Sequence, residues 1–326
     1  MADLSVKYMN LSLSSPLILG SCGLSNNLKN LVLAEKSGFG AVVLKSIFEE
    51  QIQQEVMSTL SKGEIIHTES YDYILRYQEK ESFNKYLRLV KEAKQTLSIP
   101  VIASVNCFST GGWTQYAKAI EEAGADALEV NYFILPVDFK MTAGEYSNSY
   151  IKLVKEFKKT LKIPVALKTS LYFTDMAHFM QKLSYTGIDA LVLFNRFHAP
   201  DINLDKMEFF PNNSLSSPED LSTVLRWIGI LSENIRCNLC ATTGCHNTEA
   251  LIKLILAGAD CVQSASVFYK KGIEYGAEML KGLNDWMDKN NYEKIDDFKA
   301  KMNYNKIKDP AAYFRIQFMK HIAKIE

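Results

Sequence analysis

Several short apolar segments of the chain end in side chains that could bind an anionic, carbonyl-rich ligand. These ends are Gly20-Ser21, Lys45-Ser46, Ser104 with Asn106, Asn131, Lys168-Thr169, Asn195-Arg196, Thr242-Thr243-Gly244 and Ala265-Ser266. Lysine and amide groups donate hydrogen bonds, and no Asp or Glu stands at the ends themselves. If the ends converge, they form a ring of donors suited to such a ligand. The alternative is that each end is polar only because it meets solvent.

The segments before these ends are predicted to be buried parallel strands. Four of them start with Gly after an amphipathic stretch and pass directly into a β-forming apolar run, as a helix C-cap followed by a strand would. Two others start with Ile-Pro, and Pro is tolerated at the first position of a strand. Together the eight predicted strands lie at residues 16–19, 38–44, 99–103, 124–130, 163–167, 187–193, 235–239 and 258–262.

Eight helices are predicted between these strands, because apolar residues recur there at spacings of three and four. They span residues 28–36, 83–97, 113–123, 146–161, 175–185, 218–231, 248–256 and 272–290. Strict alternation without a linker predicts a (β/α)8 TIM barrel that forms one domain over residues 1–326. A doubly wound sheet is the alternative, although Gly20-Ser21-Cys22-Gly23 lacks the G-x-G-x-x-G pattern. Two long irregular loops are expected after strands two and six, at residues 49–82 and 195–217.

The amino-acid composition limits the classes of binding partner that we expect for the chain. The 326 residues carry 37 Lys and Arg against 37 Asp and Glu, with 47% hydrophobic and 23% charged residues. A neutral globular chain is not expected to bind nucleic acid, and no apolar run is long enough to cross a membrane. The first strand follows a short hairpin-like lead at residues 4–13, and the six Cys are irregularly spaced. We therefore predict a cytoplasmic protein with free thiols.

The ends of the last two strands favour a phosphate group. Thr242-Thr243-Gly244 and Ser264-Ala265-Ser266 are small residues that are predicted to open the helices after strands seven and eight. Such loops let backbone N–H groups approach an anion at a helix N-terminus, and they are the recurrent phosphate site of these barrels. Tight packing at a turn is the alternative explanation of the small residues.

The remaining cysteines and histidines give weaker indications. Cys237 and Cys240 belong to a Cys-x-x-Cys pair, but on a strand they should point to opposite faces, so no metal site is predicted. His178 and His321 are expected to be structural or solvated. His67 and His198 fall in the two irregular loops, where either could face a ligand.

Taken in order, the strand ends resemble those of the dihydroorotate dehydrogenase family, especially its soluble class 1 branch. The similar segments run nearly end to end and are Ser15-Pro16-Leu17-Ile18-Leu19-Gly20-Ser21, Gly40-Ala41-Val42-Val43-Leu44-Lys45-Ser46, Glu129-Val130-Asn131, Val165-Ala166-Leu167-Lys168, Asn195, Ala241-Thr242-Thr243-Gly244, Gln263-Ser264-Ala265-Ser266 and Tyr292-Glu293-Lys294-Ile295-Asp296-Asp297-Phe298.

The resemblance implies an FMN-dependent oxidoreductase that converts dihydroorotate to orotate in pyrimidine biosynthesis. Its partners would be a small-molecule substrate and an electron acceptor, with a homodimer left open. Lys45, Lys168 and Asn131 would be catalytic, with both lysines beside the flavin. The implied FMN-binding residues are Gly20, Ser21, Lys45, Ser46, Asn106, Asn131, Lys168, Asn195, Thr243, Gly244, Ala265 and Ser266.

The substrate side departs from the family pattern. Where the family has a Cys or Ser base the chain has Ile134, which cannot take a proton. Its Asn-x-x-Gly-x-x-Asn segment has no counterpart, and Arg196 replaces a Ser or Thr. Arg196, His67, His198 and Tyr132 are therefore the candidates for substrate contact. The alternatives are a divergent flavoenzyme for another small unsaturated or carboxylate substrate, a flavin-binding barrel without turnover, and a phosphate-binding isomerase-type barrel.

Overall fold

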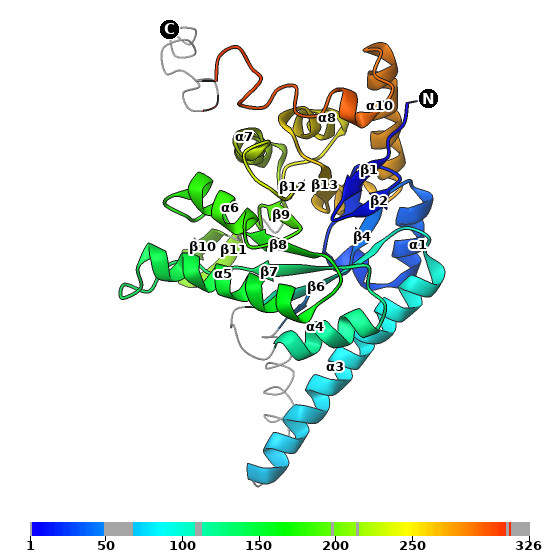
Figure 1. Ribbon diagram of the computed structural model, residues 1–326. Helices are drawn as coiled ribbons and strands as arrows, with labels where there is room; N and C mark the ends of the chain where they lie inside the picture. Colours follow the sequence, from blue (N-terminus) through cyan, green and yellow to red (C-terminus); the bar gives the residue numbers. More distant parts are fainter. Residues whose placement is uncertain are drawn as a thin grey trace.

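The computed structural model describes residues 2–48, 68–107, 113–196, 199–212, 215–310 and 313. Eight parallel strands close a barrel with helices around it (Figure 1). In order around the barrel they are β3 (Leu17–Leu19), β4 (Ala41–Val43), β6 (Val101–Cys107), β7 (Ala127–Tyr132), β8 (Val165–Thr169), β9 (Ala190–Leu193), β12 (Asn238–Thr242) and β13 (Cys261–Ser264). Because β13 pairs back onto β3, the predicted (β/α)8 barrel is confirmed and the open doubly wound sheet is excluded.

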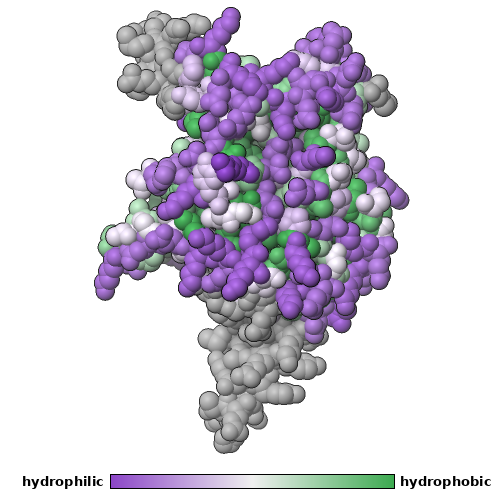
Figure 2. All heavy atoms as spheres, in the orientation of Figure 1, coloured by the Kyte–Doolittle hydropathy of each residue, from purple (hydrophilic) through white to green (hydrophobic). Residues whose placement is uncertain are grey.

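The helices pack their apolar sides on the outside of the barrel and leave a largely hydrophilic face toward solvent (Figure 2). They are α1 (Leu28–Lys36), α3 (Thr68–Thr96), α4 (Trp113–Glu122), α5 (Ala143–Thr160), α6 (Met176–Ser184), α7 (Leu221–Leu231), α8 (Thr248–Ala257), α9 (Ser266–Lys271) and α10 (Tyr275–Lys289). The short elements are η1 (Gly23–Asn26), β5 (Ile47–Phe48), η2 (Pro218–Asp220), η3 (Ile295–Asp297), the hairpin β1 (Val6–Tyr8)–β2 (Leu11–Leu13) and the hairpin β10 (Ala199–Asn203)–β11 (Glu208–Asn212).

Three predicted boundaries were wrong. The stretch 49–82 is not irregular throughout, because α3 already begins at Thr68, whereas residues 49–67 lie outside the described ranges. The stretch 195–217 contains the β10–β11 hairpin. The seventh strand starts at Asn238, whose N–H donates to the carbonyl of Asp189, so most of the predicted 235–239 segment is the turn before it.

Three of the four predicted strand segments that start with Gly have an Asp two residues later, namely Asp126, Asp189 and Asp260, and this repeat has a structural cause. Each Gly ends a helix with a positive φ, +97° at Gly124 for example, and the Asp two residues later stands at the start of the next strand. Asp126 Oδ2 accepts from the N–H of Val101 at 2.7 Å and pairs with Lys94 at 2.7 Å. Equivalent clamps are made by Asp189 with Val165 and Lys158, and by Asp260 with Leu239 and Lys299. The repeat therefore ties adjacent strands together at the N-terminal end of the barrel.

The lower half of the barrel interior is apolar. Its inward-pointing side chains are Ile18, Ala41, Val43, Ile102, Ala127, Ala166, Ala190, Val192, Cys240 and Cys261. Four of them are alanines, which leave room for other side chains, and Tyr8 and Met9 from the β1–β2 hairpin fill this space and are 0% and 1% exposed. The N-terminal end is thus closed by packing.

Candidate functional site

The C-terminal ends of β7, β8 and β9 bring together three of the predicted site residues. Asn131 is paired in register with Lys168, and Asn195 Nδ2 donates to Asn131 Oδ1 at 2.9 Å. The backbone N–H of Asn195 also donates to the carbonyl of Thr169 at 2.8 Å, which fixes the end of β9 beside that of β8. We call Asn131, Lys168 and Asn195 the amide–lysine rim.

A buried carboxylate lies below this rim. Glu129 is 1% exposed and precedes Asn131 by two residues, so both side chains face the barrel interior. Its Oε1 lies 3.8 Å from Lys168 Nζ, and its Oε2 accepts from Gln263 Nε2 at 2.5 Å. The sequence analysis missed this group because it considered only the strand tips. Its signal was an acidic residue, in phase with Asn131, inside an otherwise apolar strand.

A chain of hydroxyl groups links β3, β4, β6 and α3. Ser21 Oγ lies 3.0 Å from Ser46 Oγ, which lies 2.8 Å from Ser104 Oγ. Tyr86 on α3 continues the chain, since its hydroxyl accepts from the N–H of Ser104 at 2.7 Å. Three predicted strand ends are therefore joined. The hydrogen bonds also fix the side chain of Ser46, the residue that follows Lys45.

A pocket of about 490 Å³ opens beside Lys45, between η1 and α3. Lys45, Lys85 and Arg88 line it, with Glu92 as the one acidic side chain among its lining residues. The other polar lining groups include Asn26, Asn27 and Ser46. Positive charge therefore predominates at this side of the barrel mouth, which favours anionic ligands.

The loop after β12 combines a candidate ligand site with a packing contact. Thr243 and Gly244 both have φ of +81°, and Thr243 Oγ1 donates to the carbonyl of Phe194 at 3.1 Å. They do not open α8 directly as predicted, because α8 begins at Thr248 with the side chain of Asn247 as its N-cap. The turn instead packs under η2 and α7, which supports the tight-packing alternative for Gly244.

We expect Gly244→Ala to destabilise the protein. A Cβ at this position would lie 2.3 Å from the nitrogen of Leu221, and the positive φ would cost about 1–3 kcal/mol for a residue other than Gly. Urea unfolding measures the loss. Gly20→Ala is the control, because the nearest atoms to its Cβ would lie at 3.5 Å, an ordinary contact. Equal unfolding midpoints for both variants would contradict the expectation.

The loop after β13 is held by a buried serine–histidine pair. Ser266 Oγ accepts from the N–H of Ser216 at 2.9 Å, and Ser216 Oγ lies 3.0 Å from His246 Nε2. Burial, with the positive charge of Lys270, lowers the pKa of His246 and favours the neutral ring. Ala265 directly precedes α9, which has only six residues. These contacts fix the positions of the two loops that the resemblance assigns to the flavin phosphate.

Of the predicted substrate-side residues that the structure describes, Tyr132 faces away from the barrel interior. Tyr132 is one residue out of phase with Asn131, so it packs outside the barrel with its ring centroid 4.6 Å from that of Tyr150, and burial raises its pKa. It is therefore not positioned as a base, contrary to expectation. The N–H of Ile134 donates to Tyr150 Oη at 3.3 Å. His67 and His198 lie outside the described residues.

Arg196 stands directly after Asn195 of the amide–lysine rim. Its Nε lies 3.5 Å from Asp220 Oδ2 at the end of η2. Asp220 Oδ2 also accepts from the N–H of Ser217 at 2.8 Å, so the carboxylate is fixed by its own turn. The contact therefore joins the end of β9 to the turn before α7.

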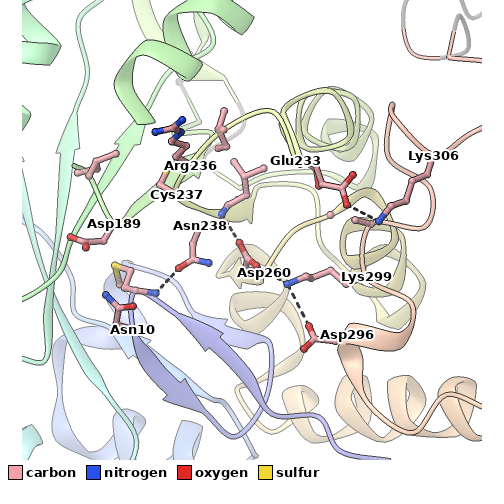
Figure 3. Close-up of a pocket in the computed structure, with 17 residues that line it drawn as sticks. Asn10, Asp189, Glu233, Arg236, Cys237, Asn238, Asp260, Asp296, Lys299 and Lys306 are labelled. Carbon is pink, nitrogen blue, oxygen red and sulfur yellow. Dashed lines mark hydrogen bonds and ion pairs between the residues drawn. The ribbon is translucent and has the colours of Figure 1, made fainter. Parts of the chain in front are cut away.

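A second pocket, of about 640 Å³, lies at the opposite, N-terminal end of the barrel (Figure 3). Several of its charged side chains pair with each other, as Glu233 does with Lys306 at 2.6 Å and Asp260 with Lys299 at 2.9 Å. Asp260 also clamps a strand N–H, as described above. Polar groups at this end of a barrel serve stability, so we place the functional site at the C-terminal end.

Two findings on the described ranges concern the cysteines and the helices. No three His, Cys, Asp or Glu side chains there are grouped so that they could hold a metal ion. Cys240 faces the barrel interior and Cys237 packs outside it, where burial raises the pKa of Cys237 to about 12. None of the described helices has the length and apolar character needed to cross a bilayer.

Comparison with known proteins agrees with the geometry. No family model matches the chain. The catalytic subunit of dihydroorotate dehydrogenase B (NAD(+)) from Thermoplasma volcanium is 26% identical over 303 residues, which cover 91% of this chain and 97% of the relative. The same subunit from Methanocella arvoryzae is 26% identical over 88% of this chain and 93% of the relative. A putative dihydroorotate dehydrogenase A (fumarate) from Aeropyrum pernix is 24% identical over 66% of this chain and 71% of the relative. This similarity, together with the closed barrel, relates the chain to the dihydroorotate dehydrogenase family.

Proposed function

We propose that the protein is an FMN-dependent oxidoreductase that acts on a CH–CH bond of a small carboxylate, with dihydroorotate as the first substrate to test. The observation that carries the proposal is the convergence of Asn131, Lys168 and Asn195 at one edge of the barrel. Each stands at a position where the chain resembles the flavin-binding residues of the family.

The rim has unused hydrogen-bonding groups of the kinds that a flavin ring needs. The hydrogen bond between the two amides uses Asn195 Nδ2 as the donor and Asn131 Oδ1 as the acceptor. The other two amide atoms, Asn131 Nδ2 and Asn195 Oδ1, have no hydrogen bond to another described residue. Lys168 Nζ has an ion pair but no hydrogen bond to the described part of the chain. An isoalloxazine edge presents both carbonyl oxygens and an N–H group, so the residues present fit this cofactor.

When bound, FMN would supply the hydride-accepting ring, and the protein would supply positioning and charge. Lys168 and Lys45 would place positive charge near the ring, and Asn131 and Asn195 would orient it. The fixed loops at Thr243-Gly244 and Ala265-Ser266 would surround the phosphate. Ile134 can hold no proton, so the chain's own proton acceptor is not at the family's usual position.

Flavin content tests the proposal directly. We expect the purified protein to be yellow, or to become so when FMN is supplied and unbound FMN is removed. A protein that neither contains nor takes up flavin would refute the proposal and favour the phosphate-binding isomerase-type barrel. Loss of the flavin colour when dihydroorotate is added without oxygen would identify the substrate. A yellow protein that no small carboxylate can reduce would be a flavin-binding barrel without turnover.

Arg196 is expected to recognise the carboxylate of the substrate. Arg196 directly follows Asn195 of the rim, and a guanidinium group can bind a carboxylate through two parallel hydrogen bonds. Small carboxylates should shift the flavin spectrum of the wild type when they bind. The same titration of Arg196→Ala should give a dissociation constant at least tenfold higher. Arg236→Ala is the control, because Arg236 stacks on Tyr185 at the other end of the barrel. Equal affinities in Arg196→Ala and wild type would contradict this role.

We also infer a cytoplasmic location and a second small molecule as electron acceptor. Six unpaired cysteines support the location, because thiols persist in reducing compartments. Fractionation of cells that produce the protein would test it.

A further inference from the structure

We propose that Glu129 is a positioning residue that holds the ammonium group of Lys168 inside the barrel and balances its charge beneath the bound flavin. The proposal rests on the proposed function and adds a residue to it. It follows from the contacts of three interior side chains, Glu129, Lys168 and Gln263, which we call the interior triad.

The register of the strands shows that Lys168 reaches downward to meet Glu129. Lys168 is level with Asn131, whereas Glu129 is level with Ala166, two residues lower on β8. Two residues along a strand correspond to about 6.6 Å. The long lysine side chain could equally extend toward the barrel mouth. The carboxylate below gives it a reason to remain inside, where its side chain is 13% exposed.

Stability alone does not explain the carboxylate. Glu129 Oε1 and Gln263 Oε1 are both buried and have no hydrogen-bond partner. At 3.8 Å the contact between Glu129 and Lys168 is an ion pair but not a hydrogen bond. Buried ion pairs with unsatisfied atoms are often less stabilising than apolar side chains of similar volume. The triad therefore costs stability, which indicates a role in the site.

Gln263 fixes Glu129 from the opposite side of the barrel. Its Nε2 donates to Glu129 Oε2 at 2.5 Å, so only Oε1 is directed at Lys168. The three donors of the ammonium group thus remain available to a ligand above it. The net charge of the triad is zero, so removing the carboxylate would leave one positive charge in a low-dielectric interior, where it acts strongly.

The test combines the redox potential of bound FMN with stability measurements on flavin-free protein. In Glu129→Gln the uncompensated Lys168 should stabilise the more negative, reduced flavin and shift its midpoint potential to a more positive value. The same change in a Lys168→Met background should shift the potential much less. Glu121→Gln is the matched control, because Glu121 accepts the N–H groups of Lys162 and Ile163 at the other end of the barrel. It should change stability and leave the potential as it is.

Urea unfolding of the flavin-free variants tests the pair without the cofactor. Lys168→Met should be less stable than the double variant Lys168→Met/Glu129→Gln, because only the single variant leaves a lone buried carboxylate. Additive losses, or a Glu129→Gln potential equal to that of the wild type, would overturn the proposal. A wild type that binds no FMN would instead refute the proposed function, and the urea comparison would then decide on the pair by itself.

Discussion

Replacing Lys168 by methionine is expected to weaken FMN binding, to slow the reduction of the flavin by substrate and to destabilise the protein. Methionine keeps the length of the side chain but removes the only cation that pairs with the buried Glu129 among the described residues. Removing one partner of a buried ion pair typically costs about 3–5 kcal/mol. The two effects are separable, since FMN binding is measured by titration and stability by urea unfolding.

Lys158→Met is the appropriate control for this variant. Lys158 likewise pairs with a carboxylate, that of Asp189, but at the N-terminal end of the barrel. Its loss should lower stability and leave FMN affinity unchanged in the folded protein. If Lys168→Met binds and reduces FMN as the wild type does, Lys168 is not part of the flavin site and the amide–lysine rim loses its central member.

The barrel could be predicted from the sequence because its signals are local. A helix that ends at Gly and a strand that begins within two residues leave a short pattern, and the Asp of that pattern clamps the neighbouring strand. The rim residues could be predicted for the same reason, since any residue at the C-terminal end of a barrel strand lies at the mouth. Asn131, Lys168 and Asn195 needed only the strand ends to be located within one or two residues.

Features that depend on contacts between distant segments could not be predicted in this way. Gly244 was interpreted as a residue that lets backbone approach an anion, and its close contact with η2 and α7 on the side where a Cβ would lie could not be foreseen. The contact between Arg196 and Asp220 joins the end of β9 to the turn before α7 and has no local signal in the sequence. The orientation of Tyr132 could have been predicted, because the two-residue period of a strand directs its side chain to the other face of the strand from Asn131. Its proximity to Asn131 in the sequence was given more weight.

Oxidation of dihydroorotate by the wild type is expected to be weak or absent. The step needs a group that removes a proton while a hydride leaves, and a positioned base typically contributes about 10²–10⁴-fold. Ile134 stands at the family's base position and has an apolar side chain, while its backbone N–H donates to Tyr150 Oη. Tyr132 cannot substitute, because it packs outside the barrel and its raised pKa disfavours the phenolate.

Ile134→Cys and Ile134→Ser test this explanation by supplying a proton acceptor at the same backbone position. Either variant should raise the rate of dihydroorotate-dependent flavin reduction above that of the wild type, by as much as 10²-fold if the base is the only missing group. Ile134→Val is the control, since it changes volume without adding chemistry. Robust turnover by the wild type would show that another residue already acts as the base. If neither variant reduces the flavin faster than the wild type, the pocket is shaped for a different carboxylate. The loss of the family's orotate-binding segment would then matter more than the loss of the base.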